Sequence, residues 1–123
     1  DYLFGRIDDD YLVGWGGRDR LRGNAGDDTM VGGNKNDFLQ GGSGADTFVF
    51  NTDNGFWAKD LIKDFELGVD RVVIEGFSQD DVNWKPLKSG LGVMAIVESG
   101  GKIVFNGHQK EDLHDFADWD FLA

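Results

Sequence analysis

Apolar residues recur at a fixed interval along the first 50 residues of the chain. They are Leu3, Leu12, Leu21, Met30, Leu39 and Phe48, so the period is nine residues without a slip. One inward apolar side chain between two outward neighbours is typical of a three-residue strand that is buried on one side. The pattern therefore predicts a series of short strands, each separated from the next by a turn.

The turns between these strands are rich in glycine and carry one Asp at a constant place. The complete units are GRIDDDYLV (5–13), GWGGRDRLR (14–22), GNAGDDTMV (23–31), GGNKNDFLQ (32–40) and GGSGADTFV (41–49). Glycine permits a positive φ, so backbone carbonyls in a turn can point at a common centre that the Asp carboxylate also reaches. Such hard oxygen ligands favour Ca²⁺ over softer metals and over Mg²⁺, which requires stricter geometry.

These units resemble the RTX (repeats-in-toxin) family, whose GGxGxDxUx nonapeptide is matched in full at 41–49. The resemblance implies an all-β fold, a right-handed parallel β-roll in which turns two units apart stack and hold calcium between them. By the same resemblance, Asp10, Asp28 and Asp46 lie on one side of the roll and Asp1, Asp19 and Asp37 on the other. Pairs 5–10 with 23–28, 14–19 with 32–37 and 23–28 with 41–46 imply about three ions, with a partial fourth site near Asp1.

The candidate metal ligands are turn carboxylates and the carbonyl groups of turn glycines. They are Asp8, Asp10, Asp19, Asp28, Asp37, Asp46 and Asp60, with Gly14, Gly17, Gly23, Gly26, Gly32, Gly33, Gly41, Gly42 and Gly44. Asp60 enters because DLIKDFELGVDRVVI (60–74) is similar to the stretch after the last repeat in serralysin-type secreted proteases. There an acidic residue helps close the final calcium turn, which makes Asp60 or Asp64 a candidate; the alternative is a solvated turn carboxylate.

Several turns depart from the repeated pattern. Arg6, Trp15 and Asn24 replace the second glycine of their units, and Asp8 and Lys35 replace the glycine at the fourth position. A lysine held in the left-handed backbone conformation costs roughly 1–2 kcal/mol. We therefore expect the turn at 32–37 to be the least regular of the series.

After Phe50 the period of nine stops, and short strands and turns are expected. Residues 93–97 and 102–105 predict an antiparallel hairpin, while 78–82 and 109–114 predict short helical turns. A solenoid needs its open end covered, so residues 51–123 are expected to cap the roll formed by residues 1–50 as one structural unit. Trp57, Trp84 and Trp119 are expected in the core or the cap, with sugar stacking as the alternative.

Composition narrows the classes of partner and of chemistry. The formal net charge of −11 argues against a nucleic acid or an anionic membrane as the main partner, because like charges repel. No apolar run reaches the roughly 20 residues that a transmembrane helix needs. The chain has no Cys, which excludes disulfides and thiolate metal sites, and it lacks HExxH, GxSxG and P-loop motifs. We therefore expect a non-catalytic module.

The outward strand positions differ between the two predicted sheets. One sheet presents Tyr11, Val13, Thr29, Val31, Thr47 and Val49, which are apolar enough to predict cover by the cap or a neighbouring domain. The other presents Tyr2, Phe4, Arg20, Arg22, Phe38 and Gln40. Two arginines beside aromatic rings are a surface that could hold an acidic polysaccharide such as alginate; the alternative is two ordinary solvated arginines.

The resemblance implies a calcium-binding RTX domain from the C-terminal end of a larger secreted bacterial protein, extracellular and folding on calcium outside the cell. The chain begins within a repeat, so we expect an upstream catalytic or toxin domain. DFLA (120–123) is similar to the acidic and hydrophobic terminus of serralysin-type proteins that type I secretion systems recognise; the alternative is a last strand packed against the hairpin. The alternatives are a polysaccharide-binding module, like the R-modules of mannuronan C5-epimerases, and an adhesion or matrix protein.

Overall fold

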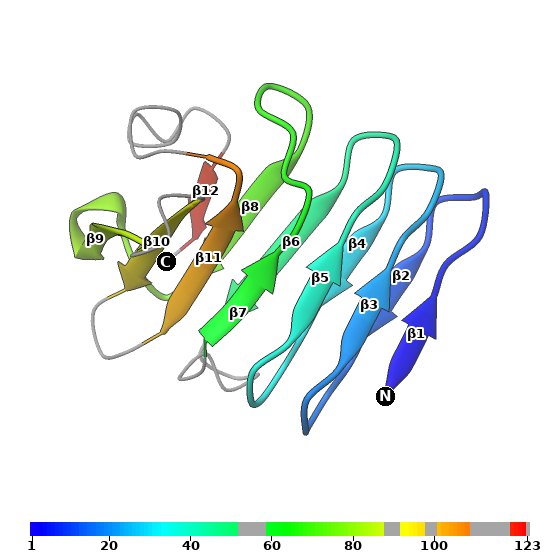
Figure 1. Ribbon diagram of the computed structural model, residues 1–123, viewed down its shortest axis with the longest axis horizontal. Helices are drawn as coiled ribbons and strands as arrows, with labels where there is room; N and C mark the ends of the chain where they lie inside the picture. Colours follow the sequence, from blue (N-terminus) through cyan, green and yellow to red (C-terminus); the bar gives the residue numbers. More distant parts are fainter. Residues whose placement is uncertain (52–58, 88–91, 98–100, 109–118, 123) are drawn as a thin grey trace.

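The computed structural model describes residues 1–51, 59–87, 92–97, 101–108 and 119–122. Figure 1 shows the elements of this part of the chain, which are almost entirely short strands. They are β1 (Tyr2–Phe4), β2 (Tyr11–Val13), β3 (Arg20–Arg22), β4 (Thr29–Val31), β5 (Phe38–Gln40), β6 (Thr47–Asn51), β7 (Lys59–Ile62), β8 (Arg71–Glu75), the 3₁₀ helix η1 (Gln79–Asp81), β9 (Val82–Pro86), β10 (Gly92–Val97), β11 (Lys102–Asn106) and β12 (Trp119–Leu122).

Consecutive strands of the repeat alternate between two sheets. One sheet has the order β1-β3-β5-β7-β11-β10-β9 and the other β12-β8-β6-β4-β2. Within each sheet the repeat strands run parallel and pair in phase, so Leu21 stands beside Leu3 and Leu39 in one sheet, and Met30 beside Leu12 and Phe48 in the other. Two nonapeptides therefore complete one coil, and the expected all-β parallel roll is confirmed.

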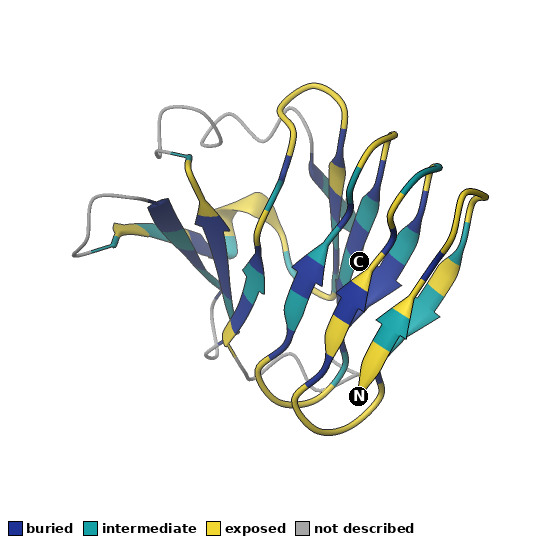
Figure 2. Cartoon of the chain, turned by 45° about the vertical axis from the view of Figure 1, so that its right-hand side comes forward, coloured by how far each residue is buried: buried dark blue, intermediate teal, exposed yellow. Residues whose placement is uncertain are grey.

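The period-nine apolar residues form the core between the two sheets. Leu21, Met30, Leu39 and Phe48 are fully buried, because each has a coil on both sides. Leu3 and Leu12 are only partly buried. Figure 2 shows the same gradient, with exposure increasing towards β1 and β2. Those two strands are the outer edges of their sheets, where no further coil covers them.

The parallel stacking continues beyond residue 50, where the nonapeptide pattern ends. β7 pairs with β5 and β8 pairs with β6, so both sheets run on without interruption. β11 then adds to β7 in parallel and turns back as the antiparallel pair β11–β10, which confirms the hairpin. The helical turn expected at 78–82 appears as η1, and the one expected at 109–114 lies outside the described residues.

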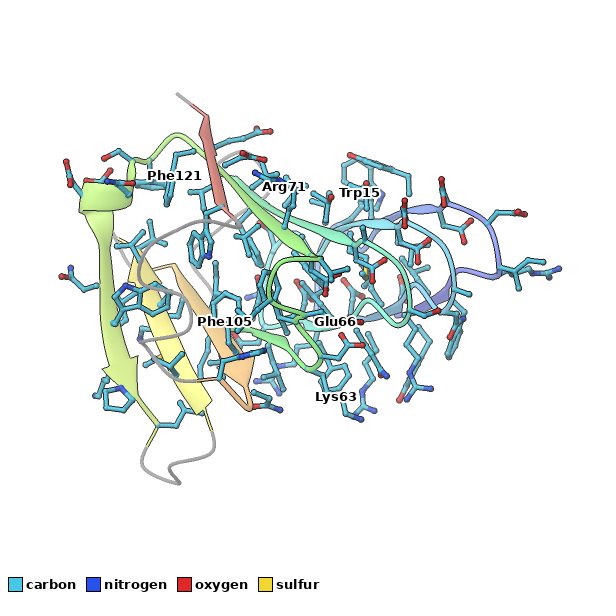
Figure 3. The ribbon with its side chains drawn as sticks, turned by 90° about the horizontal axis from the view of Figure 1, so that it is seen from above. Trp15, Lys63, Glu66, Arg71, Phe105 and Phe121 are labelled. Carbon is cyan, nitrogen blue, oxygen red and sulfur yellow. The ribbon has the colours of Figure 1, made fainter. Side chains whose placement is uncertain are left out.

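Aromatic rings from β9, β11, β12 and the loop before β8 pack against one another. The Phe105 ring lies 5.4 Å from Phe65 and 5.8 Å from Trp119, measured between ring centroids, and Trp84 lies 5.7 Å from Trp119. Figure 3 shows Phe105 within this group of side chains. Trp84 and Trp119 thus pack in the core, as expected, and Trp57 lies outside the described residues.

The last described strand adds to the edge of the sheet that contains β8, and its Trp119 ring packs on Phe105 of the hairpin. β12 pairs in parallel with β8, and the Arg71 side chain donates to both carboxylate oxygens of Asp120, at 2.9 Å from Nε and 2.5 Å from Nη2. On this same sheet Val31 is buried, whereas Tyr11 is 70% exposed. Burial of this outer face therefore varies along the sheet, and at its β2 edge Tyr11 is exposed while Val13 is half-buried. No helix in the described part of the chain is long and apolar enough to span a membrane.

The turn at 32–37 is more regular than its sequence predicts. Lys35 has φ 73°, in the left-handed region that the glycines at the same position occupy, such as Gly17 at 91° and Gly44 at 102°. The neighbouring coil fixes this backbone, because Asn34 N–H donates to the Trp15 carbonyl at 2.7 Å. Lys35 therefore keeps the left-handed conformation of this position and carries the strain that its sequence implies.

Replacing Lys35 by glycine should therefore stabilise the fold. Removing the strain gains roughly 1–2 kcal/mol, but the greater conformational entropy of glycine in the unfolded chain costs roughly 0.5–1 kcal/mol. The free energy of unfolding should therefore rise by about 0.5–1 kcal/mol. The measurement is thermal or urea unfolding in saturating calcium. Lys35→Gln is the matched control, because it removes the same charge but keeps the β-carbon. Equal stability of the two variants would contradict the claim that the backbone at Lys35 is strained.

Candidate metal-binding turns

The turn Asp residues stack in two columns, one on each side of the roll. The first column contains Asp1, Asp19, Asp37 and Asp60, and the second contains Asp10, Asp28, Asp46 and Asp70. In each column the Oδ1 atom of one Asp accepts a hydrogen bond from the main-chain nitrogen of the Asp one coil earlier, which is a backbone N–H in five cases and the terminal ammonium group at Asp1. The N···O distances are 2.6, 2.8 and 2.8 Å along the first column and 2.8, 3.0 and 2.9 Å along the second.

The second carboxylate oxygen is left without a partner in four of these residues. The Oδ2 atoms of Asp19, Asp28, Asp37 and Asp46 are buried and accept no hydrogen bond. These residues expose no more than 4% of their surface. A buried polar atom without a partner costs about 1–3 kcal/mol, and more when it is charged. Four such atoms in one small domain therefore call for a ligand that the protein itself does not supply.

The glycine that opens each turn makes room for this oxygen. A β-carbon built on Gly14, Gly23, Gly32 or Gly41 would lie 2.6, 2.1, 2.5 or 2.2 Å from Oδ2 of the Asp five residues later. At Gly14 and Gly23 the carbonyl oxygen of the opening glycine one coil later, Gly32 or Gly41, lies 2.6 or 2.7 Å from the same point. Carboxylate and carbonyl oxygens thus converge where only glycine leaves space.

Burial makes the metal-free carboxylates poor acids. Burial, and to a smaller extent the charge of Asp19, raises the pKa of Asp37 to about 6. Burial with the charges of Asp70 and Asp28 raises the pKa of Asp46 to about 7. The pKa of Asp28 is raised as well, mainly by burial. A nearby cation would reverse this effect, because it favours the ionised carboxylate.

The arrangement fits a hard divalent cation that takes most of its ligands from the backbone. No three His, Asp or Glu side chains of the described residues converge on one point, since the column carboxylates are spaced one coil apart. Each turn instead offers one carboxylate oxygen with carbonyl oxygens nearby. An all-oxygen donor set of this kind suits Ca²⁺, which accepts six to eight oxygen ligands in flexible geometry.

The remaining candidate residues shape the turns. Gly17, Gly26, Gly33, Gly42 and Gly44 all have positive φ. At Gly33, Gly42 and Gly44 a β-carbon would lie within 2.0–2.2 Å of a carbonyl oxygen in the preceding coil, so glycine is also needed there for space. The Asp8 side chain is exposed, and its carbonyl oxygen lies 2.5 Å from the β-carbon position of Gly26.

Three carboxylates after residue 50 hold the end of the repeat array. Asp60 is buried in the first column, whereas Asp64 accepts the backbone N–H groups of Gly41 and Gly42 at 2.9 and 2.8 Å. Burial raises the pKa of Asp60 to about 7. Asp70, which closes the second column, is missing from the sequence prediction. Its signal is the segment GVDRV (68–72), which repeats the spacing of GADTF (44–48), and Gly68 has a positive φ of 76°.

A second feature lies on the outer face of the sheet that contains β1, β3 and β5. The Arg20 guanidinium lies 5.5 Å from the ring centroid of Tyr2 and 5.4 Å from that of Phe38. This stack borders a cavity of about 590 Å³ whose lining also includes Arg18 and Lys59. Arg22, on the same strand, is exposed and is not among the lining residues.

Comparison with known proteins supports the assignment of the repeats. The family model of the RTX calcium-binding nonapeptide repeat matches residues 1–21 and 22–56, in four copies. No curated protein matches the chain by sequence.

Among solved structures, the chain is similar to two R-module subunits of the mannuronan C5-epimerase of Azotobacter vinelandii, each 24% identical. The match to AlgE6R3 has a TM-score of 0.67 and covers 90% of this chain and 75% of that subunit. The match to AlgE6R2 has a TM-score of 0.61 and covers 98% of this chain and 92% of that subunit. The extracellular lipase LipA of Serratia marcescens is 23% identical with a TM-score of 0.54, and the match covers 99% of this chain but 21% of the lipase. These matches cover 90–99% of this chain and therefore extend beyond the residues that the family model spans. Residues 1–56 thus match the RTX calcium-binding nonapeptide repeat, and the described part of the chain folds as a parallel β-roll similar to these R-modules.

Proposed function

We propose that this chain is a calcium-dependent folding module of a larger secreted bacterial protein. The observation that carries the proposal is the set of four buried Oδ2 atoms, on Asp19, Asp28, Asp37 and Asp46, that no protein donor satisfies. Calcium held at these oxygens would supply the missing counter-charge. The column carboxylates and the glycine carbonyls beside them would hold the ions between stacked turns, about three in number by the turn pairs that the sequence predicts.

Charge repulsion explains why folding would depend on the metal. The chain carries a net charge of −11, and the second column sets Asp28, Asp46 and Asp70 one above another on successive coils. Without a cation these carboxylates repel one another or must take up protons, and both effects oppose the compact state near neutral pH. Because binding requires the folded turns, the free energy of binding becomes free energy of folding.

This coupling suits passage from a cell that keeps calcium low to an exterior where calcium is about 1 mM. A chain that stays unfolded inside the cell can pass a type I secretion channel and fold outside. The upstream domain would then be the catalytic or toxic part, and this module would carry no activity of its own. The neighbouring lipase, in which the matched region covers 21% of the chain, is one precedent for such a module in an extracellular enzyme.

Calcium removal is the direct test of this proposal. With excess chelator at pH 7.4, the far-UV circular dichroism of the chain should lose its β signal, because the column carboxylates are left charged and uncompensated. Calcium at about 1 mM should restore the signal, and Mg²⁺ at the same concentration should not, since it holds its water and needs octahedral geometry. A β signal that is unchanged by chelator would refute the proposal.

Substitution of an opening glycine should weaken calcium binding through space alone. In Gly14→Ala the new β-carbon would meet Asp19 Oδ2 and the Gly32 carbonyl, each at 2.6 Å, so both oxygens must move. We expect the calcium midpoint to rise tenfold or more. Gly16→Ala is the matched control, because a β-carbon there has no atom within 4 Å, and its midpoint should stay within twofold of the parent. Equal midpoints for the two variants would exclude this position from the site.

A second candidate function is binding of an acidic polysaccharide. The stack of Arg20 between Tyr2 and Phe38, beside a cavity that Arg18 and Lys59 also line, favours it. Aromatic faces suit sugar rings, and guanidinium groups pair with carboxylates. The epimerase R-modules that share this fold belong to an enzyme of mannuronan, which is a polyuronate.

Titration with alginate oligomers at saturating calcium separates this role from a pure folding module. If the cavity beside Arg20 binds the polymer, Arg20→Ala should weaken binding tenfold or more. Arg22→Ala removes an equal charge from the same strand but outside the cavity lining, and its effect should stay within threefold. Absence of saturable binding by the parent chain, or an equal loss of affinity in both variants, would count against this cavity as the binding site.

A further inference from the structure

The first complete turn of the array, residues 5–10, differs from the others in what its carboxylate contacts. Asp10 Oδ2 accepts the backbone N–H of Arg6 at 2.8 Å. The same atom in Asp19, Asp28, Asp37 and Asp46 has no hydrogen-bond partner. Asp10 is also only half-buried, whereas those four residues are buried. The turn at 5–10 therefore satisfies its own carboxylate with a donor from the protein.

A second donor takes a carbonyl oxygen of the same turn. The Asn24 side-chain amide donates from Nδ2 to the Gly5 carbonyl at 2.8 Å. Asn24 stands at the second position of its unit, where the later units at 32–40 and 41–49 have Gly33 and Gly42. Glycine has no side chain to reach the preceding coil, so this contact belongs to the start of the array.

The backbone of the first turn differs in the same way. In each of the four turns from 14–19 to 41–46, the second and fourth residues both have positive φ. Neither Arg6 nor Asp8 does. Among the five complete repeat turns, the turn at 5–10 is thus the one that lacks the left-handed conformation at its second residue, and it is also the one in which the N–H of that residue donates to the Asp.

The other end of the second column shows the same contact. Asp70 Oδ2 accepts the backbone N–H of Glu66 at 2.8 Å, and the two residues have the spacing of Arg6 and Asp10. Figure 3 labels Glu66, which lies in the loop before β8. In Asp28 and Asp46, the two inner members of this column, the Oδ2 atom has no hydrogen-bond partner.

We propose that the turn at residues 5–10 is closed by hydrogen bonds from Arg6 and Asn24 instead of by calcium, so that Asp10 is not a calcium ligand. The pair 5–10 with 23–28, one of three that the sequence predicts, then holds no ion. Calcium binding begins with the turns at 14–19 and 23–28, whose oxygens are unsatisfied. This inference rests on the proposed calcium function and specifies which turns carry it.

The test compares two variants that each keep one hydrogen bond and remove one charge. Asp10→Asn retains an oxygen that can accept the Arg6 N–H. Asp28→Asn retains Oδ1 as the acceptor for the Asp10 N–H but replaces Oδ2, which has no hydrogen-bond partner, with an amide NH₂ group. Isothermal titration calorimetry gives the number of calcium ions bound and the midpoint. Asp10→Asn should leave the number unchanged and the midpoint within threefold. Asp28→Asn should lose one ion or raise the midpoint at least tenfold.

A gain of binding removes misfolding as an explanation. Arg6→Gly, Asp8→Gly and Asn24→Gly together give the first turn the GGxGxD pattern of 41–46 and remove the Asn24 donor. This triple variant should bind at least one more calcium ion than the parent. Loss of an ion in Asp10→Asn, or an unchanged number in the triple variant, would overturn the inference. A parent chain that binds no calcium would instead overturn the proposed function.

Discussion

The contact between an Asp Oδ1 atom and the backbone N–H of the Asp one coil earlier organises this molecule. It fixes how successive coils stack, and it recurs five times at 2.8–3.0 Å along the two columns. Because Oδ1 is used in this way, Oδ2 points at the opening glycine of its own turn. The fold thus creates buried, unsatisfied oxygens as a consequence of its own hydrogen bonding. A bound cation is the counterpart that this geometry requires.

The repeat explains why so much of the fold follows from sequence. A period of nine with one apolar residue fixes a strand, and the identical spacing of Asp and apolar residues fixes the register between coils. Stacking of turns two units apart and the two columns follow from the resemblance of these units to RTX nonapeptides, and the hairpin after residue 92 follows from its own two apolar segments. The stacking and the columns depend on contacts that recur every 18 residues, so their signal occurs several times in the sequence.

The features that sequence missed depend on single contacts. Asp70 is 24 residues after Asp46, whereas the repeat interval is 18, so the longer connection hides its place in the column. Arg6 and Lys35 illustrate the same limit. Both replace glycine in a turn, yet Lys35 keeps the left-handed backbone and Arg6 does not. The turn of Lys35 is held by the preceding coil through the Asn34 N–H and the Trp15 carbonyl, whereas the Arg6 N–H donates to Asp10 in its own turn.

The most direct test of the account is the position of calcium in crystals of the chain grown with calcium, measured by anomalous scattering at long wavelength. The account predicts peaks beside Oδ2 of Asp19 and Asp28, next to the carbonyl oxygens of Gly32 and Gly41, and no peak beside Oδ2 of Asp10. Absence of density beside Asp19 and Asp28 would contradict the claim that calcium satisfies the buried carboxylates, and so would full occupancy beside surface carboxylates alone.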